Sequence, residues 1–110
     1  MRAFKVVFGV LILVLFGTIQ ANGIDQSLCD SGAKVELYPN GSLKRCVLKD
    51  VFRSREVDCK GQSPISFYDN GQIKSCALAE RAMIGGQKCK QFGTISFYRD
   101  GKFQSCIKED

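Results

Sequence analysis

The chain has 110 residues, with 16 Lys and Arg, 11 Asp and Glu, six Cys and no His. The absence of His removes the usual general base at neutral pH and the ordinary Ser-His and Cys-His nucleophile pairs, so the composition predicts a protein that is not an enzyme. The basic residues are scattered among acidic ones instead of forming a run, which is typical of a solvated surface and argues against nucleic acid as a partner.

Residues 1–21 are predicted to be a signal peptide, a helix that is not part of the fold. Arg2 and Lys5 form a positively charged N-terminal region, and residues 6–19 are apolar or small. Ala21 then provides the small residue that a cleavage site needs. A membrane-spanning helix is the alternative, but it needs about 20 apolar residues. Cleavage would leave residues 22–110, with 14 basic and 11 acidic side chains. We therefore expect a secreted or periplasmic protein, attached to the membrane only if the signal is uncleaved.

Six cysteines divide residues 22–110 into three copies of one unit. The two cysteines of a copy are 17 positions apart, and successive copies start 30 positions apart. This spacing predicts a single repeat domain with repeats at 29–58, 59–88 and 89–110. The cysteines are Cys29, Cys46, Cys59, Cys76, Cys89 and Cys106.

Disulfides are the expected use of these cysteines, because a small exported domain buries too little apolar surface to be safely stable alone. Two regular pairings fit the repeat. Each unit can close on itself, as Cys29 with Cys46, or neighbouring units can be joined, as Cys46 with Cys59. The first pairing is favoured, because the segment between the two cysteines is then a complete module. Each such loop would stabilise the fold by about 3 kcal/mol.

Metal binding is the rival use of the cysteines. Zinc ligands come in closely spaced pairs such as Cys-x-x-Cys, often with His, whereas the nearest cysteines here are 13 positions apart. The same spacing argues against a redox-active cysteine pair. We expect neither a metal nor a cofactor.

Each unit has the pattern of a β-hairpin, because apolar and polar residues alternate on both sides of a glycine-containing turn. A two-residue turn centred on Asn40 and Gly41 would require Pro39 to donate a hydrogen bond, which proline cannot do. We therefore predict a three-residue loop, in which a type I turn is followed by a glycine in the left-handed conformation.

This register predicts two different faces of the hairpins, because alternate residues of a strand point to opposite sides. One face is an apolar strip that must be covered. The other face is the candidate binding face, where the tyrosines either form a binding strip or pack over the second cysteine of each unit as a second small core. The apolar strip contains Val35, Leu37, Leu43, Ile65, Phe67, Ile73, Ile95, Phe97 and Phe103. The candidate binding face contains Tyr38, Tyr68, Tyr98, Lys44 and Lys74, with Gln104 beside Tyr98 and with Cys46, Cys76 and Cys106.

The segments between the hairpins are predicted to contribute a third strand. It is expected at residues 82–84, with a counterpart at residues 51–52, and a short helix at residues 78–83 is the alternative. The expected product is all-β: an antiparallel meander of three disulfide-stapled hairpin repeats, stacked side by side so that each buries its apolar strip against a neighbour.

Residues 67–73 read as an aromatic pair, one variable residue, Asn-Gly, a polar residue and an apolar residue, with close copies at 37–43 and 97–103. This motif resembles MORN-type hairpin repeats, especially the bacterial variants, although this chain adds a cysteine pair to each copy and has a longer period. The resemblance implies an open-edged β-sheet that acts as a scaffold or interaction surface, with lipid or protein partners and no catalytic residues.

The sequence therefore predicts a small exported, disulfide-stabilised repeat protein that acts as a binding or structural module. Its partner is expected to be another protein or a cell-envelope component. The alternative is a secreted small cationic effector, a toxin or an inhibitor, which the size, the disulfides and the positive charge also fit.

Overall fold

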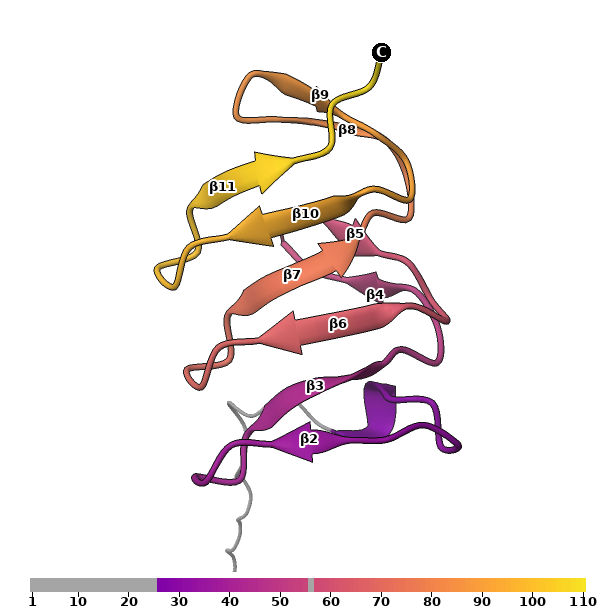
Figure 1. Ribbon diagram of the computed structural model, residues 1–110, viewed down its shortest axis with the longest axis vertical. Coiled ribbons are helices and arrows are strands. Elements are labelled where there is room, and N and C mark those ends of the chain that lie inside the picture. The colour runs from indigo at the N-terminus through magenta and orange to yellow at the C-terminus, as the bar shows by residue number, and fades with distance from the viewer. Residues whose placement is uncertain (1–25, 56) are drawn as a thin grey trace, which may run out of the picture.

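The structure is a computed structural model that describes residues 26–110 apart from residue 56 (Figure 1). The predicted signal peptide, residues 1–21, lies outside the described residues. Apart from the short 3-10 helix η2 (Gln26–Leu28), the regular elements of the described chain are β-strands. They form one six-stranded and two two-stranded antiparallel sheets, so the all-β prediction is confirmed.

Three hairpins stand side by side in the six-stranded sheet (Figure 1). Their order across the sheet follows their order in the chain, so the predicted antiparallel meander with one hairpin per repeat is confirmed. The strands are β2 (Glu36–Leu37), β3 (Leu43–Val47), β6 (Pro64–Phe67), β7 (Ile73–Ala77), β10 (Thr94–Phe97) and β11 (Phe103–Cys106).

The hairpin turns have the predicted three-residue form. In the second repeat, Gly71 N donates a hydrogen bond to Tyr68 O (3.0 Å), and Gly71 has a φ of +89°. Glycine tolerates this left-handed conformation because it has no Cβ atom. The same bond and the same sign of φ recur in the other two turns, and the pairing of Phe67 with Ile73, both on the predicted apolar strip, follows from this geometry.

A β-bulge in each hairpin corrects the prediction for the cysteines. In the second repeat Phe67 pairs with Ile73, but its neighbour Ser66 pairs with Ser75, so Lys74 is an extra residue in the strand. Lys74 and Ser75 therefore face the same side, and the cysteine that follows returns to the apolar side. Strict alternation, on which the prediction rested, takes no account of the extra residue. The predicted position beside the tyrosines is wrong for Cys46, Cys76 and Cys106, which pack with the core.

Each repeat closes on itself through one disulfide, which confirms the favoured pairing. The bonds join Cys29 to Cys46, Cys59 to Cys76, and Cys89 to Cys106.

Two small hairpins between the repeats lie against the apolar face of the main sheet (Figure 1). β4 (Phe52–Arg53) pairs with β5 (Asp58–Cys59), and β8 (Ala82–Ile84) pairs with β9 (Gln87–Cys89). The predicted strand at 82–84 is correct, and the helix at 78–83 is wrong. These strands form a second layer instead of stacking beside the main hairpins, so the second and third apolar strips are covered by this layer and not only by neighbouring repeats.

Aromatic contacts hold the two layers together. Phe52 packs edge-to-face against Phe67, with ring centroids 6.1 Å apart. In the turn between β8 and β9, a Cβ atom added to Gly85 would come within 2.5 Å of the Phe103 ring, so only glycine allows this close approach. The covering hairpins also end in Cys59 and Cys89, so two of the disulfides join this layer covalently to the main sheet.

The core fills the space between the two layers. Its largest fully buried side chains are Phe67, Leu43, Leu48, Ile65, Leu78 and Ile95. Leu37, at the edge strand β2, is 45% exposed, in contrast to the rest of the predicted apolar strip.

Candidate functional site

The face of the main sheet that points away from the covering hairpins is the candidate site, and we call it the bare face. In the inner strands its residues alternate with buried or half-buried ones, and most of them are polar. It consists of Glu36, Tyr38, Lys44, Arg45, Val47, Pro64, Ser66, Tyr68, Lys74, Ser75, Ala77, Thr94, Ser96, Tyr98, Gln104 and Ser105.

A straight row of residues crosses the middle of the bare face. Direct pairing places Ser66 beside Ser75, Ser75 beside Ser96, and Ser96 beside Ser105. Arg45 continues the row next to Ser66. In the described part of the chain, none of these four serine hydroxyls has a protein hydrogen-bond partner, although a hydroxyl can both donate and accept.

Each of the first two tyrosines is paired with a lysine, and these pairs flank the row on the side of the turns. The Lys44 ammonium lies 5.6 Å from the centroid of the Tyr38 ring, and the Lys74 ammonium lies 5.7 Å from that of Tyr68. These are cation–π distances. The sequence-predicted residues Tyr38, Lys44, Tyr68 and Lys74 are thus brought together, and the two lysine charges point to the same side as the serines.

The tyrosine hydroxyls connect successive repeats. Tyr38 Oη donates a hydrogen bond to Phe67 O (2.7 Å), and Tyr68 Oη donates to Phe97 O (2.9 Å). Both rings are half-buried by this arrangement. The interpretation that the tyrosines pack over the cysteines is wrong, because the bulge puts the cysteines on the opposite face. Tyr38 and Tyr68 instead hold neighbouring hairpins in register.

Tyr98, in the third of the described hairpins, differs from the other two tyrosines. Its side chain is 53% exposed, and among the described residues its hydroxyl has no hydrogen-bond partner. Gln104 occupies the position of Lys44 and Lys74, so no lysine covers the ring. The third repeat therefore ends the bare face with an open aromatic ring.

The turns also connect the repeats. Asn40 Nδ2 donates to Asp69 O (3.4 Å), and Asn70 Nδ2 donates to Arg99 O (3.2 Å). Arg99 in turn forms an ion pair with Asp69. The charge of Asp69 is therefore neutralised by a residue of the neighbouring repeat, and its role is structural.

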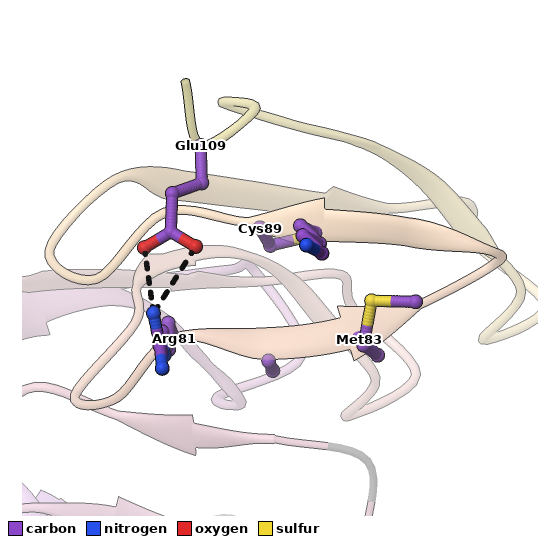
Figure 2. Close-up of a pocket in the computed structure, with 6 residues that line it drawn as sticks. Arg81, Met83, Cys89 and Glu109 are labelled. Atoms are coloured by element: carbon purple, nitrogen blue, oxygen red, sulfur yellow. Dashed lines mark hydrogen bonds and ion pairs between the residues drawn. The ribbon is translucent and has the colours of Figure 1, made fainter.

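A shallow cavity of about 290 Å³ lies elsewhere, between the β8–β9 hairpin and the C-terminal tail (Figure 2). Arg81 Nη1 lies 3.4 Å from Glu109 Oε1 across it, while Met83 extends toward solvent and is 66% exposed. The Cys89 sulfur in its wall is held in a disulfide. Arg81 and Glu109 are explained by this ion pair, which ties the C-terminal tail to the hairpin, so we do not assign a ligand to this cavity.

Within residues 26–110, residue 56 excepted, no group of three or more His, Cys, Asp or Glu side chains could hold a metal ion. The same part of the chain contains no helix long and apolar enough to cross a membrane.

Two surface features were missed by sequence reasoning. The serine row could have been found by aligning the repeats, but its straightness depends on the bulge. Phe92 has a φ of +69° and is 58% exposed, with the Lys60 ammonium 5.5 Å from its ring centroid. Gln62 occupies the equivalent place one repeat earlier, also with a positive φ, so nothing in the residue type signals this conformation.

Fold and site together define a class, the all-β proteins built from tandem, disulfide-closed hairpins with one covered and one bare sheet face. A scan against protein-family models finds no match, and searches of curated proteins and of solved structures find none either.

Proposed function

We propose that this chain is a small exported repeat protein, stabilised by its disulfides, that acts as a binding module and has no catalytic activity. The observation that carries the proposal is the difference between the two faces of the main sheet. One face is covered by hairpins and buried, while the bare face repeats a Tyr–Lys pair and hydroxyl groups along the array. A repeated polar surface that no other described element of the chain covers is suited to recognition of another molecule.

Export is supported by the three disulfides together with the predicted signal peptide. Disulfides persist in the periplasm and outside the cell and are rare where thiols are kept reduced. All three are closed within a repeat, and no cysteine is left free. The partner is accordingly a protein or another component of the cell envelope or its surroundings.

The absence of catalysis is supported by the roles of the carboxylates that could have acted as acids or bases. Asp69 pairs with Arg99, Asp58 with Arg53, and Glu109 with Arg81. Asp100 accepts a hydrogen bond from Lys102 N (2.9 Å) and stabilises its own turn. Each of these four carboxylates has a structural explanation.

Site-specific photo-crosslinking in the source cell tests the binding module. A photoreactive phenylalanine derivative replaces Gln104 on the bare face in one variant and Lys49, beside the covering hairpin, in the matched control. We expect the first variant to give a discrete crosslinked product in the envelope or medium fraction, and the control to give none.

Crosslinking from both positions, or from neither, would contradict the proposed use of the bare face. Recovery of the protein in reduced form in the cytoplasm would contradict export. Growth arrest of other cells by the purified oxidised protein would instead favour the alternative, a secreted cationic effector.

A further inference from the structure

We infer that the bare face binds a linear anionic polysaccharide, which lies across the strands along the row of serines. This inference rests on the proposed function, and it names the chemical class of the ligand. Three properties of the face carry it: the sign of its charges, the hydroxyl row, and the spacing of its aromatic rings.

The charges of the bare face are predominantly positive. Lys44, Arg45 and Lys74 are exposed on it, while Glu36 at the edge strand is its one acidic residue among those described. Arg99, at the adjoining turn, is already neutralised by Asp69. Lysine and arginine form strong charge-assisted hydrogen bonds with carboxylate, sulfate and phosphate groups. The face therefore favours an anionic ligand.

The lysine charges are also held in place. Because each ammonium lies over a tyrosine ring at 5.6 or 5.7 Å, the long side chain is restrained before a ligand arrives. Each tyrosine is itself restrained by its hydrogen bond to the next repeat. Restrained groups lose less conformational entropy on binding, which favours recognition of charges at fixed intervals.

The hydroxyl row distinguishes a sugar polymer from other polyanions. Four serine hydroxyls in direct register have no partner within the described chain, and each can donate to and accept from a sugar hydroxyl. From Arg45 to Ser105 the row crosses five strands, a length of about 19 Å at ~4.8 Å per strand. A lipid headgroup is much shorter than this row, and the row offers a peptide no apolar pocket.

The aromatic spacing fits the same ligand. Successive tyrosines are two strands apart, or about 10 Å, close to the length of a disaccharide unit in an extended chain. Charged groups on alternate sugars would then meet Lys44 in the first repeat and Lys74 in the second. At the end of the row the open ring of Tyr98 offers an apolar surface for the face of a sugar ring.

Titration of the oxidised protein with defined polymers tests this inference. The probes are polygalacturonate and dextran sulfate, with neutral dextran, polyglutamate and vesicles of phosphatidylglycerol and phosphatidylcholine for comparison. We expect binding to at least one of the two anionic polysaccharides, and weaker binding to the three comparison probes.

Matched variants locate the binding. Lys44→Gln with Lys74→Gln copies the residue that the third repeat already has at Gln104, and we expect it to raise the Kd about tenfold or more. The control, Lys49→Gln with Lys88→Gln, removes the same charge from the loop before β4 and from strand β9 of the covering layer, and should change the Kd by less than about threefold. Unchanged melting temperatures show that both variants are folded.

A second pair of substitutions tests the hydroxyl row. Ser75→Ala with Ser96→Ala should raise the Kd for the polysaccharide about fivefold and leave any residual binding of polyglutamate unchanged.

Four results would overturn the inference. The first two are no binding of either anionic polysaccharide and tighter binding of vesicles or polyglutamate. The others are an equal rise in Kd for the two double lysine variants and an unchanged Kd for the double serine variant. Crosslinking from position 104 would still support the binding module in each case, so the two failures can be told apart.

Discussion

At the scale of single residues, the tyrosines show how one side chain serves both the fold and the bare face. Tyr68 donates its hydroxyl to Phe97 O of the next repeat, and its ring lies under the Lys74 ammonium. Tyr98 occupies the equivalent place in the third repeat, but Gln104 stands where the lysine would be, and among the described residues its hydroxyl has no acceptor. The same residue type therefore stabilises the array in one repeat and remains available in another.

This difference predicts unequal effects of removing the hydroxyl. Tyr68→Phe should lower the free energy of unfolding by about 1 kcal/mol, because Phe97 O loses a half-buried hydrogen bond. Tyr98→Phe is the matched control and should leave it unchanged. Denaturation by urea measures both, and equal losses would show that the inter-repeat hydrogen bond contributes nothing.

At the scale of elements, the turn and the bulge together determine the two faces. The three-residue turn sets the first pair of each hairpin, and the bulge then inserts one residue before the serine pair. The bulge turns each second-strand cysteine into the core and leaves two consecutive residues, such as Lys74 and Ser75, on the bare face. The composition of the bare face is therefore a consequence of hairpin geometry.

The left-handed glycine of the turn can be tested directly. Gly71→Ala should cost about 1–2 kcal/mol of unfolding free energy, because a side chain disfavours a φ of +89° even where nothing lies within 4 Å of the new Cβ atom. Gly32→Ala is the control: its φ is not in the left-handed range and its new Cβ meets only Asp30 Oδ1 at 3.8 Å. The melting temperature should fall for Gly71→Ala and not for Gly32→Ala. An unchanged melting temperature for Gly71→Ala would show that the left-handed conformation of the turn costs nothing.

At the scale of the whole molecule, the disulfides do more than close loops. Cys59 and Cys89 end strands of the covering hairpins, while Cys76 and Cys106 belong to the main sheet. Each of these two bonds therefore ties one layer to the other. In a small protein with a thin core, such covalent links compensate for the limited apolar surface that can be buried.

Removal of the central disulfide tests this contribution. Cys59→Ala with Cys76→Ala should lower the free energy of unfolding by about 3 kcal/mol, because the unfolded chain regains the entropy of the opened loop. The Cys89→Ala, Cys106→Ala variant opens a loop of the same length, since both cysteine pairs are 17 positions apart, and should lose a similar amount. Chemical denaturation under oxidising conditions provides the comparison. If the Cys59→Ala, Cys76→Ala variant were as stable as the native protein, the central disulfide would not contribute to stability.

Much of the architecture could be predicted because it depends on local patterns. Pro39 excluded the shorter turn, Gly71 indicated the longer one, and equal cysteine spacing favoured pairing within repeats. The extra residue at Lys74 could not be predicted, because a bulge depends on how two strands satisfy their hydrogen bonds together. The hydrogen bond of the Tyr68 hydroxyl could not be predicted either, because its acceptor, Phe97 O, belongs to the next repeat.

The sequence by itself determined the repeat, the hairpins, the turn type and the preferred disulfide pairing, since these follow from spacing, alternation and the conformational limits of glycine and proline. Only the tertiary structure decided which face the cysteines occupy, what covers the apolar strips, and which hydroxyls have no partner. The reason is physical: the covering layer and the hydroxyl partners depend on contacts between different hairpins, and the residue that the bulge inserts within each hairpin reverses the side on which the following residues of that strand lie.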